Sequence, residues 1–313
     1  MKTTEASTRE AFGKTLVELG RHNKDIVVVD ADLSPSTMTS FFAQQFPGRF
    51  FDCGLQEQNM VSIAAGLAAA GKIVFVSTFA IFVTCRCFDQ LRLCLSQPAL
   101  NAKIVATHGG ITVGEDGSSH QAIEDLALCC ALPGFTVVVP ADAIETVEAI
   151  RVAANVQGPF YIRLSRQKTP IVYSEGCRFR LGKAVTMRQG SDATVIAVGI
   201  MVAKALEAAD VLIRQGIDCR VLNMHTVKPL DEATVVKAAS ETGAIVVAEE
   251  HLAQGGLGSR VAQTAAREIP VPMEFVNLGD RYAQSGKPDE LLQRYGLTAR
   301  DIEQAVKSAV RRK

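Results

Sequence analysis

The stretch "IVFVSTFAIFVTCRCFDQLRLCLSQPALNAKIVATH" (73–108) contains the pattern that decides the fold. A short β-branched run at 73–79 leads into a helical segment, and a second β-branched run follows at 103–108. Similar runs are found at 25–32, 49–53, 135–140 and 159–164, with a helix predicted before them at 6–21. Strands that alternate with helices predict a parallel sheet covered on both faces.

A second alternating series follows the segment 165–182, which mixes Pro, Gly and charged residues without a sustained period, as linkers do. Its strands are predicted at 193–199, 218–224, 244–250 and 273–279, and a closing helix at about 298–311. We therefore predict two parallel-sheet α/β domains, 1–170 and 185–313, joined by a linker at 171–184. A chain of 313 residues fits two domains of about 150 residues each.

Composition excludes some functional classes. The 33 basic and 33 acidic residues give no net charge that would attract nucleic acid or an anionic membrane, so we expect a small substrate or a protein partner. The eight cysteines form neither a Cys-x-x-Cys pair nor a zinc pattern with the five histidines, and we expect reduced, buried side chains. The N-terminal "MKTTEASTREAFG" lacks the apolar core of a signal peptide, which predicts a cytoplasmic protein.

The segment "GLQEQNM" (54–60) places Glu57 where a predicted strand ends and a helix begins. A glutamate in the first helical turn favours the positive end of the helix dipole, and local pattern alone supports that role. Its neighbours Cys53, Leu55 and Met60 indicate burial, however, and a buried carboxylate needs a partner or a raised pKa. Glu57 is therefore also a candidate functional residue.

The segment "THGGITVGEDGSSHQAIEDL" (107–126) is a Gly-rich loop between a predicted strand and a helix, where α/β proteins usually bind ligands. It contains His108, Glu115, Asp116 and His120. An alternative is a plain turn in which Ser118 or Ser119 caps the helix. The number of ionisable side chains favours a polar substrate site.

Two further groups of residues leave alternatives open. Phe79 and Phe82 would share a helix face, where core packing is the default and a ring-stacking pocket the alternative. Two converging arginines and a hydroxyl would suit a phosphate, but the pattern alone does not group such distant residues. The candidates are Arg9, Ser36 and Arg166, with Ser36 inside "DADLSPSTM" (30–38), which predicts a strand leading into a capped helix; His225 and His251 have no evident partner.

Taken in order, these segments resemble the carboxyl-terminal half of transketolase. The motifs are "GLQEQNMVSIAAGLA", "STFAIF", "THGGITVGEDGSSHQAIEDLA", "PFYIRLSRQ" and "VLNMHTVKPLD". The resemblance covers a pyrimidine-binding domain and a transketolase C-terminal domain. It implies a transferase of the pentose phosphate pathway or of another branch of carbohydrate metabolism, which uses thiamine diphosphate to move a two-carbon ketol unit from a ketose to an aldose phosphate.

The resemblance also implies roles for individual residues. Glu57 matches the glutamate that hydrogen-bonds the aminopyrimidine ring of thiamine diphosphate, and Asp32 an acidic residue near the cofactor at the subunit interface. Phe79 and Phe82 match rings that pack on the pyrimidine, but Cys85 replaces a third ring.

The remaining matches concern the substrate. His108, Asp116 and His120 match residues that line the substrate channel, and the two histidines lie near the reacting atoms. Arg9, Ser36 and Arg166 match the set that binds the phosphate of a sugar phosphate.

The transketolase "GDG" motif, followed by an Asn, that holds magnesium and the diphosphate has no counterpart here: "GEDG" (114–117) belongs to the substrate loop and "GDR" (279–281) to the second domain. We therefore expect no metal ligands in this chain. Its expected partner is an N-terminal transketolase subunit, in an α2β2 assembly, without which it is inactive.

Other identities weighed are the β subunit of a 2-oxo-acid dehydrogenase, a 1-deoxyxylulose-5-phosphate synthase-like enzyme, a non-catalytic subunit, and a transketolase for an unusual phosphorylated or sulfonated ketose. Asp116, His120 and the arginines argue against the first, the missing amino-terminal half against the second, and Glu57 with "GEDGSSHQ" against the third.

Overall fold

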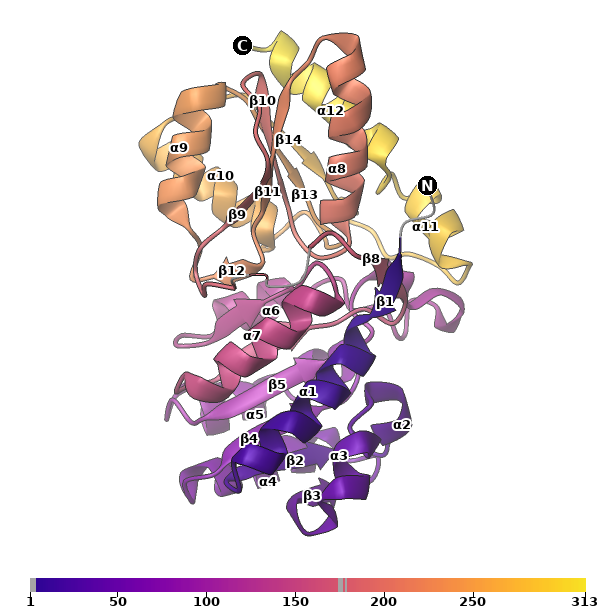
Figure 1. Ribbon diagram of the computed structural model, residues 1–313, viewed down its shortest axis with the longest axis vertical. Helices are drawn as coiled ribbons and strands as arrows, with labels where there is room; N and C mark the ends of the chain where they lie inside the picture. Colours follow the sequence, from indigo (N-terminus) through magenta and orange to yellow (C-terminus); the bar gives the residue numbers. More distant parts are fainter. Residues whose placement is uncertain (1–3, 174–176, 178) are drawn as a thin grey trace.

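Two mostly parallel sheets, each covered by helices, lie one above the other along the long axis of the molecule (Figure 1). The computed structural model describes residues 4–173, 177 and 179–313. The fold class predicted from the sequence is confirmed, because both halves are α/β layers. The linker predicted at 171–184 includes residues 174–176 and 178, which lie outside the described residues.

The first domain contains a seven-stranded sheet in which only the edge strand is antiparallel. The order is β12 (Thr226–Lys228), β6 (Thr136–Val138), β7 (Phe160–Arg163), β5 (Ala102–Ala106), β4 (Ile73–Ser77), β2 (Ile26–Asp30) and β3 (Phe50–Asp52). Alternate residues of β2 face opposite sides, so Ile26 and Val28 belong to one apolar core and Val27 and Val29 to another. The six parallel strands match the predicted runs.

Helices cover both faces of this sheet. One face carries α1 (Thr8–His22), α3 (Ser40–Gln45) and α7 (Ala143–Asn155). The other carries α4 (Glu57–Ala69), α6 (Asp125–Ala131) and a stretch with π-helical turns at Phe82–Arg86 and Leu91–Ser96 around α5 (Phe88–Gln90). Short helical turns complete the layer at α2 (Ser34–Thr37) and Pro47–Arg49.

The second domain has a five-stranded sheet in the order β14 (Met273–Val276), β13 (Ile245–Ala248), β10 (Ala193–Ala197), β11 (Cys219–Asn223) and β9 (Val185–Arg188). Around it lie α8 (Met201–Leu212), α9 (Glu232–Thr242), α10 (Leu257–Glu268), α11 (Pro288–Arg294), α12 (Ala299–Arg311) and a 3-10 turn at Ile213–Gln215. The closing helix α12 begins next to the predicted position because Thr298 and Asp301 form a capping box.

Four short edge strands were not predicted. These are β1 (Glu5–Ser7), which pairs with β8 (Lys168–Pro170), together with β9 and β12. Three or four residues are too few to show a period. The strand β12 has a structural consequence, because it comes from the second domain and pairs with β6 of the first. The sheet of the first domain is therefore completed by the second.

Two local predictions are corrected. The helix predicted after "DADL" is the single turn α2, and it has no side-chain cap. Instead the buried Asp30 carboxylate accepts the Leu33 N–H at 2.8 Å and the Thr39 hydroxyl at 2.8 Å. The eight cysteines are all free, as predicted, but only Cys87, Cys129 and Cys219 are buried. Four others are partly exposed and Cys85 is exposed, so the prediction that all are buried is wrong for these five. Within the described residues, no helix has the length and apolar character needed to cross a membrane.

Glu145, in the first turn of α7, joins the two domains. Its fully buried carboxylate accepts the Ala141 N–H at 2.7 Å and the amide of Asn223, on β11, at 2.9 and 3.0 Å. Burial raises the pKa of Glu145 from 4.5 to about 7, although these hydrogen bonds oppose the rise. The folded chain therefore retains a proton that the unfolded chain releases.

The raised pKa predicts a pH-dependent stability that Glu145→Gln removes. Glu145 stabilises the wild type fully below pH 4.5, and this contribution is lost as the pH rises through 7. The unfolding free energy of the variant minus that of the wild type should therefore increase by up to about 3 kcal/mol between pH 4.5 and 8. Urea unfolding of both chains across this range measures the difference, and a pH-independent difference would contradict the assignment.

Candidate active site

The carboxyl ends of four neighbouring strands bring the candidate residues to one edge of the first sheet. Asp32 follows β2, Glu57 follows β3, Phe79 follows β4 and His108 follows β5. Because these strands are parallel neighbours, their carboxyl ends meet, and ligands of α/β proteins usually bind at such an edge. The fold thus collects residues that are far apart in the sequence.

Glu57 is the first residue of α4, where its charge favours the positive end of the helix dipole. It is also only 6% exposed, as expected for the buried carboxylate considered from the sequence. Its carboxylate has a partner that sequence reasoning missed. Arg86 Nη1 donates to Oε1 at 2.6 Å, whereas Oε2 has no hydrogen bond to any residue the structure describes. The only signal was an isolated arginine in the otherwise uncharged "FVTCRCF" (82–88).

Aromatic rings form a continuous cluster beside Glu57. The rings of Phe79 and Phe82 stack with centroids 5.5 Å apart, and Phe79 stacks on His108 at 3.7 Å. His120 meets Phe82 edge-on at 5.3 Å, and the guanidinium of Arg86 lies 4.0 Å from the Phe82 ring centre. The predicted shared helix face is wrong, since Phe79 precedes the helix and bridges to Thr107.

His108 is held as a neutral imidazole. It is 3% exposed, and its Nδ1 lies 2.8 Å from the Thr107 hydroxyl. Burial, and then the positive charges of Arg9 and Arg166, lower the pKa of His108 to about 3. Its φ of 63° is strained for a non-glycine residue, and such strain is frequent at functional sites. A neutral ring can donate a hydrogen bond from one nitrogen and accept at the other.

The loop between β5 and α6, residues 107–124, is called the site loop below. It contains a 3-10 helix at Ile111–Asp116, and His120 Nδ1 lies 2.9 Å from the Ser119 hydroxyl. The alternative in which Ser118 or Ser119 caps the next helix is wrong, because α6 begins at Asp125 without a side-chain cap. Asp116 is exposed on the same loop.

Arg9, Ser36 and Arg166 do come together. Arg9 donates to the Ser36 carbonyl at 2.6 Å and to the Arg166 carbonyl at 2.7 Å. Arg166 pairs with Glu115 at 3.1 Å. Burial and the charge of Arg166 lower the pKa of Arg9, which reflects two guanidinium groups held close to each other. Such a pair of guanidinium groups attracts an anion. Ser36 contacts Arg9 through its backbone carbonyl and not through its hydroxyl.

The other predicted residues lie as follows. Asp32 is exposed, has a φ of 61° and donates its N–H to Asp52 at 2.9 Å. Cys85, which stands where the resemblance implies a third ring, has its sulfur 3.9 Å from Glu124. The His225 ring packs against Phe179 in a tilted arrangement with ring centroids 4.2 Å apart, and His251 accepts the Ala127 N–H, both at the domain junction. Among the described residues, no group of three or more His, Cys, Asp or Glu side chains could hold a metal ion.

Comparison with known protein families gives two matches that together cover most of the chain. Residues 4–172 match the model described as "Transketolase, pyrimidine binding domain". Residues 182–302 match "Transketolase, C-terminal domain".

Individual proteins agree with these matches. The chain is 44% identical to a "Putative transketolase C-terminal section" of Methanocaldococcus jannaschii, over 94% of this chain and 93% of the relative. It is 41% identical to a "6-deoxy-6-sulfo-D-fructose transketolase subunit SqwH" of Clostridium sp., over 100% and 97%. A solved "Split gene transketolase, inactive beta4 tetramer" superimposes with a TM-score of 0.91 at 49% identity, covering 99% of this chain and 100% of the solved one.

The low pKa of His108 predicts that its ring stays neutral from pH 8 down to pH 5. Its side-chain ¹⁵N resonances should keep the positions of a neutral tautomer across that range, because protonation begins only as the pH approaches 3. NMR of the ¹⁵N-histidine-labelled chain measures this, and His108→Gln identifies the resonances. A titration with a midpoint above pH 5 would show that His108 is not held neutral.

Proposed function

The chain belongs to the transketolase family and corresponds to its C-terminal half, and we propose that it is the C-terminal subunit of a split, thiamine-diphosphate-dependent transketolase. It would work with an N-terminal subunit to transfer a two-carbon ketol unit from a ketose or ketose phosphate to an aldose phosphate. The observation that carries this proposal is the ring cluster of Phe79, Phe82 and His108 at one sheet edge, to which Arg86 links the Glu57 carboxylate.

The residues at this edge fit the pyrimidine ring of the cofactor. Thiamine diphosphate, when bound, supplies the carbon nucleophile that the protein itself lacks. Glu57 would bind a ring nitrogen through Oε2, since Arg86 already holds Oε1. Phe79 and Phe82 would provide the apolar ring contacts, and the open side at Cys85 would be closed by cofactor or by the partner. We propose that Asp32 lies near the cofactor where the subunits meet.

The substrate would enter past the two histidines. Neutral His108 can donate to or accept from a sugar hydroxyl through Nε2, because Nδ1 is engaged by Thr107. His120 and Asp116 would contact further hydroxyls from the other end of the site loop. The anionic end of the sugar would bind near Arg9 and Arg166, where it would compete with Glu115 for the Arg166 guanidinium.

The proposed N-terminal subunit would bind magnesium and the diphosphate and would cover the outer face of α4. That face exposes Gln58 and Asn59 at its start and then mostly small or apolar residues, including Ile63 at 36% exposure, and Leu55 nearby is 71% exposed. Exposed apolar patches of this kind are typical of protein interfaces. The solved relative is described as an inactive beta4 tetramer, which supports a subunit that self-associates and is inactive alone, with α2β2 as the proposed active form.

The family matches favour transketolase chemistry over the dehydrogenase and synthase alternatives. The arginine pair does not distinguish a phosphorylated from a sulfonated sugar. The Clostridium relative is named for a sulfonated ketose, and a sulfonate, like a phosphate, would be attracted by two arginines. A transketolase that serves sulfonated sugars is therefore the second candidate beside the pentose phosphate pathway.

Replacing Glu57 tests the proposed chemistry. We propose that Glu57 shares a proton with the ring nitrogen, which a glutamine amide cannot do. With the N-terminal subunit, thiamine diphosphate and magnesium, Glu57→Gln should therefore lower the turnover of ketol transfer by about 100-fold or more, which is the usual contribution of a positioned proton-transfer group. Turnover is measured with a panel of phosphorylated and sulfonated ketoses. Glu10→Gln is the matched control, since Glu10 also lies in the first turn of a helix. A Glu57→Gln enzyme with most of its activity would refute the assignment.

Replacing Ile63 tests the partner surface. Ile63→Glu would place a charge at the proposed interface and should abolish assembly with the N-terminal subunit, with the circular dichroism of the chain unchanged. Light scattering after size-exclusion chromatography measures the assembly. Ile213→Glu is the control, because Ile213 is similarly exposed, at 43%, but lies in the second domain. If Ile63→Glu assembled like the control, the α4 face would not be the interface.

A further inference from the structure

The site loop is held by contacts from both domains: its Gly109 N–H donates to the Leu164 carbonyl of the first domain at 3.1 Å, and several further contacts come from the second domain. Ile111 and Ile123, near its two ends, are fully buried in the apolar core of the second domain. The Ile123 carbonyl accepts the Leu252 N–H at 2.8 Å, and the Gln121 amide donates to the Gln284 carbonyl at 3.0 Å. The second domain therefore contributes to the position of a loop that follows a strand of the first domain.

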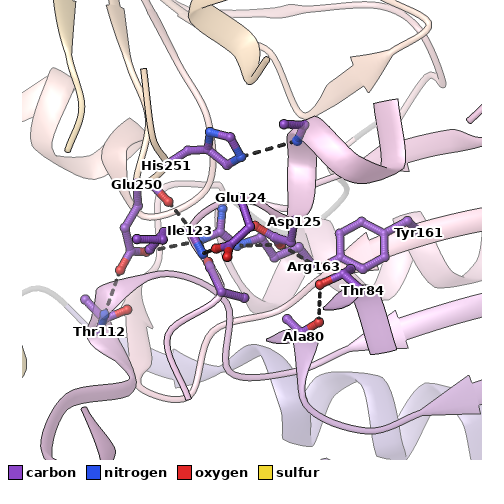
Figure 2. A network of polar contacts seen from close by, with 12 residues as sticks. Ala80, Thr84, Thr112, Ile123, Glu124, Asp125, Tyr161, Arg163, Glu250 and His251 are labelled. Atoms are coloured by element: carbon purple, nitrogen blue, oxygen red, sulfur yellow. Dashed lines mark hydrogen bonds and ion pairs between the residues drawn. The ribbon is translucent and has the colours of Figure 1, made fainter. Parts of the chain in front are cut away.

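Glu250 makes the central contact of this anchoring (Figure 2). It follows β13 in the second domain, and its Oε1 accepts the Thr112 N–H of the site loop at 2.7 Å. Its backbone carbonyl accepts Arg163 Nη2 at 2.9 Å, and the same nitrogen lies 3.3 Å from the Ala122 carbonyl. One residue thus contacts the loop near its start and, through Arg163, near its end.

The side chains of Glu250 and Arg163 pack so closely against the site loop that only glycine can stand at positions 109 and 110. A Cβ at Gly110 would overlap the Glu250 carboxylate, and a Cβ at Gly109 would overlap the Arg163 side chain. Gly110 also has a φ of 80°, whereas Gly109 is outside the positive-φ region. Gly109 is therefore required by close packing rather than by a turn.

Each of the two proposed substrate histidines lies within four residues of one of these anchor points, Thr112 or Ala122. His108 precedes Gly109 directly, and His120 lies two residues before Ala122. A strained φ such as that of His108 is kept only where neighbouring contacts fix the backbone. The hydrogen bonds at Thr112 and Ala122 are among the contacts that fix the site loop.

We propose that Glu250 is a positioning residue through which the second domain fixes the site loop, and thereby the placement of His108 and His120. The effect on substrate binding rests on the proposed function, whereas the effect on the loop does not. Glu250 itself would touch neither substrate nor cofactor.

The neighbouring Glu249 provides a matched control. It is also buried, but its carboxylate accepts the Leu257 and Gly258 N–H groups, both at 2.7 Å, at the start of α10 inside the second domain. Replacing Glu249 therefore removes a buried carboxylate of the same size without removing a hydrogen bond to the site loop.

Hydrogen exchange of the full chain, measured without any partner, tests the loop. Glu250→Ala should accelerate amide exchange at 109–123 by about 10-fold, because the Thr112 donor loses its acceptor. Glu249→Ala should accelerate exchange only around 255–262. Glu250→Gln, which keeps an acceptor oxygen, should restore much of the protection. Should the alanine variant not fold, Glu250→Asp, which is too short to reach Thr112, replaces it. Unchanged exchange at 109–123, or the same pattern for both glutamates, would overturn the proposal.

Kinetics with the N-terminal subunit test the consequence for the site. Glu250→Ala should raise the KM for the sugar substrate about 10-fold and leave the Kd for thiamine diphosphate within about twofold, whereas Glu249→Ala should change neither. An unchanged KM for Glu250→Ala would overturn the positioning role. If the wild-type assembly transferred no ketol unit, the proposed function would fail, and the exchange measurement would still decide the role of Glu250.

Discussion

The guanidinium of Arg163, at the end of β7, is the buried charge that holds the two domains in register. It is 5% exposed and lies 3.4 Å from the Asp125 carboxylate and 3.9 Å from that of Glu250. Tyr161 donates its hydroxyl to Asp125 from the same strand. Removing one member of a buried ion pair typically costs about 3–5 kcal/mol, because the remaining charge is left without compensation. The residues around Arg163 are therefore constrained together.

This constraint extends to the site loop. Asp125 begins α6, where the loop ends, and Glu250 holds the loop at Thr112, so the same charge cluster contacts the chain on both sides of His120. The second domain also supplies the edge strand β12 to the first sheet, and Lys228 on that strand donates to the Cys130 carbonyl at the end of α6. The small domain is thus an integral part of the site architecture rather than an appendage.

A second group of charged and aromatic side chains links α4 to the site loop. Arg86 links the Glu57 carboxylate to the face of Phe82, and Phe82 in turn contacts His120. A carboxylate, a cation, an aromatic ring and an imidazole therefore follow one another from α4 to the site loop. A bound pyrimidine, in the proposed function, would meet this series at Glu57 and the phenylalanine rings.

The sequence by itself determined the two α/β domains, because β-branched runs and amphipathic helices repeat often enough to show their periods. It also identified Glu57 and the site-loop histidines as candidates, since strand ends in parallel sheets are predictable. The resemblance had grouped Arg9 with Arg166, but only the tertiary structure decided the contacts between distant groups: Arg86 on Glu57, the Arg9 guanidinium on the Arg166 carbonyl, and Glu250 on Thr112. The short strand β12 and these pairings depend on how the chain packs in three dimensions, and no local period records contacts between residues separated by 29 to 157 positions.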